Sequence, residues 1–265
     1  MNRIWIPGAG HYGHFSNRHE MRRGHPLMRY KVRKAPQWPA PVLPINWYGS
    51  LVFPMDWNDQ LGDCFEAAIC HGDNTLTGAN GLESVFDQAA IKAQYTAASG
   101  GDNGLDEGQA MGLWKSGVAG DKQAVIYDYL DIDATDAEVM QSAIANFGGI
   151  AFTFSVPDAW ISSFNADGST IWDAPATPDE NNGHAVWLNG VLANGNYHLI
   201  TWGSSCQITQ AGINAVEPGA TVVFSPRWFN PATGLDPSGV HYDVKAALWT
   251  QLGGAALPPW IPPTS

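Results

Sequence analysis

The sequence predicts an α+β fold in which a helical half precedes a β half. Between residues 64 and 117 apolar side chains recur at helical spacing, most clearly over residues 84–98. From residue 150 onward the chain changes to short runs rich in β-branched and aromatic residues, separated by Gly, Asn and Asp clusters. Such runs predict an antiparallel sheet or barrel. With 265 residues, 45% of them hydrophobic, the chain is long enough for one well-packed domain.

The first 56 residues are expected to form an extended arm that is basic and then proline-rich. Residues 1–35 carry eight basic residues and one acidic residue, a net charge of +7, whereas the remainder carries five basic and 24 acidic residues, a net charge of −19. Prolines between residues 36 and 54 fix φ and predict an extended path. The arm is expected to bind the acidic body of its own chain or a neighbouring subunit. An acidic body disfavours nucleic acid as a partner.

The helical half is predicted to contain helices over residues 64–71, 84–98 and 106–115, and a further helix ends at Phe147. Asp133 or Thr135 is expected to cap that further helix, and Gly148-Gly149 to end it. Strands are predicted over residues 150–156, 185–191, 197–202 and 220–224.

The chain is predicted to end in a Pro- and Trp-rich extended tail over residues 256–265, after a body that spans residues 57–255. Trp260 and Ile261 are expected to anchor this tail in a groove of the same subunit or of another. The extended ends at 1–35 and 256–265 therefore suggest homo- or hetero-oligomeric neighbours.

Several classes of protein are disfavoured. No run approaches the ~18 apolar residues of a membrane span, so no membrane partner is expected, and the first residues lack the features of a signal peptide. A soluble protein made in the cytoplasm is expected. Three cysteines at irregular spacing predict neither a disulfide framework nor a four-ligand zinc site, and no cofactor or metal is expected.

Cys64 opens an Ala-rich helix, directly after a polar stretch that ends in Gly62-Asp63. The partial positive charge of a helix N-terminus stabilises a thiolate and lowers the pKa of the thiol, which favours a nucleophile. Gly62 permits a sharp turn, so the Cys64 amide and the side chain of Asn58 or Gln60 could together hold an oxyanion. The alternative is a core cysteine on a buried helix.

A histidine stands at the entrance of an apolar strand in Asn182-Gly183-His184-Ala185-Val186, and the next strand of an apparent hairpin ends in Thr201-Trp202-Gly203. This spacing suits a general base that is supported by the neighbouring strand. The alternative is an ordinary surface or core histidine.

In this order the motifs resemble the papain family, whose signature is a Gln, a Cys on the central helix, His-Ala-Val, and then Asn-Ser-Trp-Gly. The match runs from about Trp57 to Val223 and is most similar to compact bacterial and phage variants with Gly-Asp-Cys, Gly-His-Ala-Val and Thr-Trp-Gly. The resemblance implies a papain-like fold, in which a central Cys-bearing helix packs on an antiparallel β half. It also implies that Cys64 is the nucleophile, that His184 is the base and that Trp202 shields the partner of the histidine.

Two departures from the family pattern concern the site. Asn58 stands where the family keeps its oxyanion-hole Gln, which is one methylene longer, and Gln60 is a second candidate donor. Ile200 stands where the family keeps the Asn that orients the histidine, and its side chain cannot hydrogen-bond an imidazole. Either Thr201 takes this role, or Cys64 and His184 act as a dyad.

Two functions follow from these observations. The first is a cysteine peptidase, or a related thiol acyl-transfer hydrolase, that acts on peptide or protein substrates. The alternative is a catalytically silent papain-fold structural or binding protein of a larger assembly, such as a capsid or tail component incorporated into a phage virion. The Cys64–His184 pair favours the first, whereas Ile200 and the two extended ends favour the second.

Overall fold

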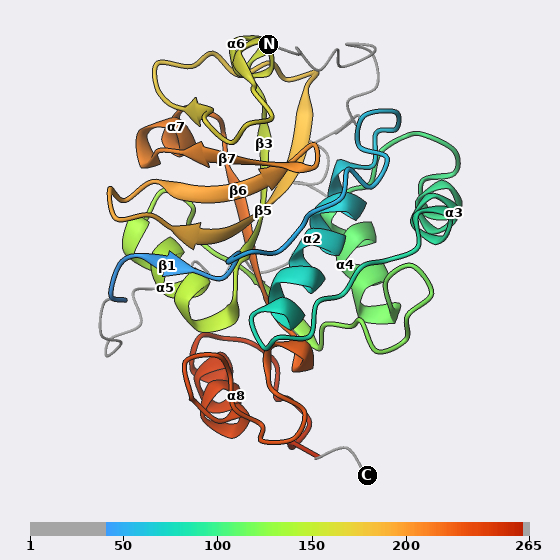
Figure 1. Cartoon of the computed structure of the whole chain (residues 1–265), viewed down its shortest axis with the longest axis vertical. Coiled ribbons are helices and arrows are strands. Elements are labelled where there is room, and N and C mark those ends of the chain that lie inside the picture. Colours follow the sequence, from blue (N-terminus) through green and yellow to red (C-terminus); the bar gives the residue numbers. More distant parts are fainter. Residues whose placement is uncertain (1–40, 262–265) are drawn as a thin grey trace.

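The computed structural model describes residues 41–261, in which three helices lie on one side of the molecule and a sheet on the other (Figure 1). The helices are α2 (Cys64–Gly78), α3 (Gln88–Ser99) and α4 (Glu107–Ser116), and α2 lies between the other two and the sheet. The predicted α+β class is confirmed. The basic arm, residues 1–35, lies outside the described residues.

Local capping explains where two of these helices begin. The Asp87 carboxylate accepts the backbone N–H of Ala90 at 2.9 Å and starts α3. Asp106 and Gln109 form a reciprocal capping box at the start of α4. Helix α2 extends seven residues beyond the predicted end at residue 71, because its polar C-terminal half is buried rather than solvated.

The fourth helix is α5 (Ala137–Phe147), and Gly148 ends it with a left-handed φ of 84°. Its N-cap is Asp136, whose carboxylate accepts the N–H groups of Glu138 and Val139. The prediction of Asp133 or Thr135 as the cap was therefore wrong. Asp133 instead accepts the Thr135 hydroxyl and backbone N–H, which makes a turn before the helix.

Across residues 41–261 the sheet has eight strands, seven of them in the spatial order β2-β8-β3-β5-β6-β7-β4, and β1 pairs with β5. The strands are β1 (Ile45–Asn46), β2 (Asp128–Asp131), β3 (Ile150–Ser155), β4 (Ile171–Trp172), β5 (Gly183–Val191), β6 (Tyr197–Thr201), β7 (Ser204–Ile208) and β8 (Gly219–Phe224). All pairs are antiparallel except β4 with β7. Strands β1, β2, β4 and β7 were not predicted.

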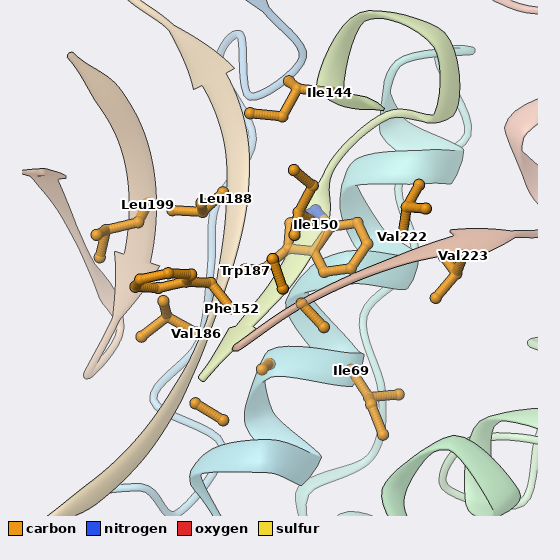
Figure 2. Packing of buried hydrophobic residues seen from close by; sticks show 14 of the residues in the cluster. Ile69, Ile144, Ile150, Phe152, Val186, Trp187, Leu188, Leu199, Val222 and Val223 are labelled. Carbon is orange, nitrogen blue, oxygen red and sulfur yellow. The ribbon is translucent and has the colours of Figure 1, made fainter. Parts of the chain in front are cut away.

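The core lies between α2 and the sheet. Figure 2 shows side chains from α2, α5, β3, β5, β6 and β8 in one cluster. Every residue of α2 from Cys64 to Thr77 is buried. Gly72 allows close packing here, because a Cβ at this position would lie 2.6 Å from Trp114 and 3.1 Å from Trp187.

No element was predicted between residue 224 and the tail at 256–265. The structure has the 3₁₀ turn Pro226–Trp228 and α8 (Tyr242–Gln251) there, and two short helices, α6 (Asp158–Ser163) and α7 (Gln210–Ala215), were also missed. The described part of the tail lies on its own chain: the Trp260 ring packs 5.3 Å from that of Tyr242, whose hydroxyl donates to the Pro258 carbonyl at 2.8 Å. Ile261 is 75% exposed and does not anchor the tail on this chain. No helix in residues 41–261 could span a membrane.

Candidate active site

The backbone that leads to Cys64 adopts an unusual conformation. Asp56 and Trp57 both have left-handed φ values, 53° and 69°, each at a cost of about 1–2 kcal/mol. Gln88 holds both residues. Its side-chain NH2 group donates to the Asp56 carboxylate at 2.7 Å, and its backbone carbonyl accepts the Trp57 indole N–H at 2.7 Å. Asp56 also lies 3.3 Å from buried His71. These contacts set the loop that ends at the first residue of α2.

Cys64 lies at the N-terminus of α2, as predicted, but its thiol is buried. Burial raises the pKa of Cys64 to about 12; a hydrogen bond from the Ala185 backbone opposes this effect and the nearby Asp63 carboxylate adds to it. The expectation that the helix terminus lowers this pKa was therefore wrong, because desolvation outweighs the partial charge of the helix. The hydrogen bond with Ala185 places the sulfur beside the residue that follows His184.

His184 lies in β5 and is 1% exposed. Its Nε2 lies 2.7 Å from Oγ1 of Thr201, the last residue of β6. Burial lowers the pKa of His184 to about 3. At neutral pH the site thus contains an uncharged imidazole and an uncharged thiol.

Trp202 covers His184. The two rings stack with centroids 4.8 Å apart, and Phe164 and Trp172 hold the indole edge-on from other directions. Trp202 and Gly203 form the two-residue turn between β6 and β7, both with positive φ, 46° and 65°. Such turns favour Asn or Gly at the first position, so a tryptophan there is strained. The turn therefore places an aromatic ring over the histidine at a conformational cost.

Ile200 and Thr201 point to opposite faces of β6, since side chains alternate along a strand. Ile200 is buried opposite Trp187 and Ser205, and takes no part in the contact with His184. The hydroxyl of Thr201, one position later in the chain, makes that contact. The structure thus brings Cys64, His184 and Thr201 into one region.

The two predicted oxyanion donors lie in the loop before α2. Asn58 is half-buried, and its backbone N–H donates to Met55; Gln60 is exposed, and its backbone N–H donates to Trp57. Within residues 41–261 neither side chain makes a hydrogen bond to Cys64.

Sequence reasoning missed two buried carboxyl groups beside Cys64. Asp63 and Glu66 are both 0% exposed, and Asp63 occupies the N-cap position of α2 without capping it. Burial raises the pKa of Asp63 to about 9 and that of Glu66 to about 8, and the nearby Asp56 adds to both effects. The available signal for the burial of Glu66 was that both of its sequence neighbours, Phe65 and Ala67, are apolar. Within the described range no cluster of three or more His, Cys, Asp or Glu side chains could hold a metal ion.

No protein-family model matches the sequence, and no curated protein matches it. Solved structures do. Xylellain, a cysteine protease from Xylella fastidiosa, is similar with a TM-score of 0.55 and 13% identity over 81% of this chain and 96% of the other. Procathepsin L 3 from the larval midgut of Tenebrio molitor is similar with a TM-score of 0.56 and 14% identity, over 73% of this chain and 74% of the other. A recombinant stem bromelain precursor is similar with a TM-score of 0.52 and 16% identity, over 71% of this chain and 70% of the other.

The likeness extends over most of the described chain, and these neighbours are papain-like cysteine proteases. The Cys64-bearing helix and the His184-bearing strand occur in the order that the resemblance predicted. The chain has the fold of the papain-like cysteine proteases.

Proposed function

We propose that this chain is a cysteine peptidase, or a related thiol acyl-transfer hydrolase, that uses Cys64 as nucleophile and His184 as general base. The observation that carries the proposal is the 2.7 Å hydrogen bond between His184 Nε2 and Thr201 Oγ1. A hydroxyl can accept the Nε2 proton, which leaves the lone pair of Nδ1 free to receive the thiol proton. Thr201 thereby takes the orienting role that Ile200 cannot fill.

The directions of the pKa shifts suggest how the nucleophile forms. A raised pKa of Cys64 and a lowered pKa of His184 favour a neutral pair at rest. In the proposed reaction the thiol proton moves to His184 Nδ1 as the sulfur attacks the carbonyl carbon of a peptide substrate. The imidazolium then protonates the leaving amine, and water hydrolyses the thioester. The Cys64 N–H with Asn58 or Gln60 would stabilise the oxyanion once the loop before α2 approaches.

The alternative is a silent papain-fold protein of a larger assembly, such as a phage capsid or tail component. One observation favours it: Cys64 is 6% exposed and His184 is 1% exposed, so substrate has to displace whatever covers the sulfur. Such burial suits a pair that has become part of the core.

Cleavage of a fluorogenic peptide library distinguishes the peptidase from the silent structural protein. A peptidase predicts cleavage that Cys64→Ala and His184→Ala abolish and that Cys70→Ala, a matched removal of another buried thiol from α2, preserves. Cleavage that persists in Cys64→Ala would exclude this nucleophile.

Alkylation by iodoacetamide, read at Cys64 by mass spectrometry, adds a second criterion. A neutral thiol predicts a rate that rises about tenfold per pH unit from pH 7 to pH 9 without a plateau. A plateau below pH 7 that depends on His184 would instead indicate a preformed ion pair. Absence of cleavage together with no alkylation would favour the structural alternative.

A further inference from the structure

A second hydrogen-bonded relay joins one residue from each of three adjacent strands. His198 lies in β6, Ser205 in β7, and Asn189 in β5 at the irregularity where the β5–β6 register shifts. Nε2 of His198 lies 3.0 Å from Ser205 Oγ, and Nδ1 lies 2.6 Å from Asn189 Oδ1. None of these residues takes part in the Cys64 site.

The direction of each hydrogen bond follows from donor and acceptor chemistry. Thr75 Oγ1 donates to the His71 carbonyl at 2.8 Å, so it accepts from Asn189 Nδ2, 3.1 Å away. The Asn189 amide is thereby fixed with Oδ1 towards His198, and Nδ1 of that ring must carry a proton. Burial lowers the pKa of His198 to about 4, so the ring is neutral at pH 7. Nε2 therefore presents a lone pair, and Ser205 donates to it.

Packing holds the imidazole in place. The Tyr48 ring stacks on His198, with centroids 3.5 Å apart and planes 12° apart. His198 is 6% exposed, whereas Ser205 is half-buried, so the base is enclosed and the hydroxyl is nearer to solvent. Gly168 is a neighbour of Ser205, since a Cβ at this position would lie 3.6 Å from the Ser205 Cβ.

We propose that Ser205, His198 and Asn189 form a second, serine-based hydrolytic site that acts on small esters with good leaving groups. A hydroxyl that donates to an unprotonated imidazole nitrogen, with the other nitrogen held by an acceptor, is the arrangement that activates a serine nucleophile. A β-bulge is a common means of turning a side chain towards an active site.

The reaction balances without a co-reactant other than water. Ser205 Oγ attacks the ester carbonyl carbon, and its proton moves to His198 Nε2. The bond from carbon to the leaving oxygen breaks, and the leaving group takes that proton. Water, deprotonated by the same nitrogen, then attacks the acyl carbon. The bond from that carbon to Ser205 Oγ breaks, Oγ takes the proton back from Nε2, and a carboxylic acid is released. Asn189 is neutral and stabilises an imidazolium less than a carboxylate would, so leaving groups as good as phenolates are required.

Hydrolysis of p-nitrophenyl acetate by the full chain with Cys64→Ala tests the proposal, because this background removes acylation of that thiol. Ser205→Ala should lower the rate by a factor of about 100, and His198→Gln should lower it similarly. Ser204→Ala is the matched control, since the Ser204 hydroxyl donates to the Ala166 carbonyl and does not contact His198. This control should leave the rate within about twofold of the rate of the Cys64→Ala background.

Labelling by a fluorophosphonate probe gives a readout that does not depend on turnover. The expected result is a single adduct on Ser205 that is lost in His198→Gln while the circular dichroism spectrum is unchanged. The proposal is overturned if Ser205 stays unlabelled in folded protein, or if Ser205→Ala hydrolyses the ester as fast as its background. Peptide cleavage by the chain with Cys64 intact should not respond to Ser205→Ala, which separates this proposal from that of the thiol site.

Discussion

The hydroxyl of Thr201 lies 2.7 Å from Nε2 of His184, the nitrogen that would otherwise be buried without a partner. The contact joins the end of β6 to the start of β5. Through this contact Thr201 affects both the orientation of the imidazole and the stability of the fold, and the two effects can be measured separately.

Replacing Thr201 by Val keeps the shape of the side chain and removes the hydroxyl. We expect kcat/KM for peptide cleavage to fall on the order of tenfold to a hundredfold, and the free energy of unfolding to fall by about 1–3 kcal/mol because a buried ring nitrogen loses its partner. Thr201→Ser retains the hydroxyl and should recover most of the activity. Steady-state kinetics and urea unfolding measure both effects. Equal activity of the Val and wild-type chains would contradict the orienting role.

The buried carboxyl groups of Asp63 and Glu66 predict a pH dependence of stability. Their pKa values rise to about 9 and about 8 in the folded chain, so the native state binds protons that the unfolded state has released. This contribution is complete below the unfolded pKa values near ~4 and is lost as pH rises through the folded values. The free energy of unfolding should therefore decrease from pH 7 to pH 9.5, a range in which His184 and His198 stay neutral.

Asp63→Asn and Glu66→Gln together should flatten this decrease, as measured by urea unfolding at pH 7, 8 and 9.5. Asp167→Asn is a suitable control, because Asp167 is exposed and its pKa is lowered by hydrogen bonds with Ser169. If the free energy of unfolding falls equally steeply with pH in the double variant and the wild type, these two carboxyl groups are not the source of the pH dependence.

Gly203 and Gly195 offer a matched pair of turn glycines. Both have left-handed φ values, 65° and 85°, but a Cβ at Gly203 would lie 3.1 Å from the Met55 nitrogen, whereas a Cβ at Gly195 meets nothing within 4 Å. Either Ala substitution should cost about 1–2 kcal/mol of conformational strain. Gly203→Ala should cost about 1–3 kcal/mol more, because residues 54 and 55 have to move. Thermal unfolding of both variants isolates the difference, and equal losses would argue against a close contact there.

The C-terminal tail is expected to stabilise its own chain. Trp260→Ala removes a ring that packs on Tyr242 and Phe229, and should lower the free energy of unfolding by about 1–3 kcal/mol. Ile261→Ala, a change at an exposed position, should have almost no effect. Urea unfolding at several protein concentrations provides the measurement. A loss that grows on dilution would indicate that the tail contributes to contacts between subunits.

The periodicity of apolar residues, together with capping residues and glycines, predicted the helices and strands whose signals lie in the local sequence. Asp106 and Gln109 form a capping box that sequence spacing reveals, and Gly148 ends a helix where a left-handed residue is required. The order of the motifs around Cys64, His184 and Thr201 likewise predicted the helix and the two strands on which these residues lie.

The missed features depend on tertiary surroundings. Strand β7 (Ser204–Ile208) carries Ser205, Cys206 and Gln207, an unremarkable pattern that becomes a strand because β6 and β4 lie on either side. The C-terminal half of α2 was missed because its Asp73, Asn74 and Thr75 side chains suggest a loop, and only burial with partners from distant segments makes them helical. The pKa of Cys64 was mispredicted for the same reason, since burial is not a local property of sequence.

The complete enclosure of α2 has a consequence for how the molecule unfolds. A helix with side chains buried from Cys64 to Thr77 cannot keep its environment if either the sheet or the flanking helices detach. The two halves are therefore bound into one cooperative unit, although their secondary structures differ. Heating should produce a single calorimetric transition, with equal calorimetric and van't Hoff enthalpies, rather than stepwise melting of a helical lobe and a β lobe.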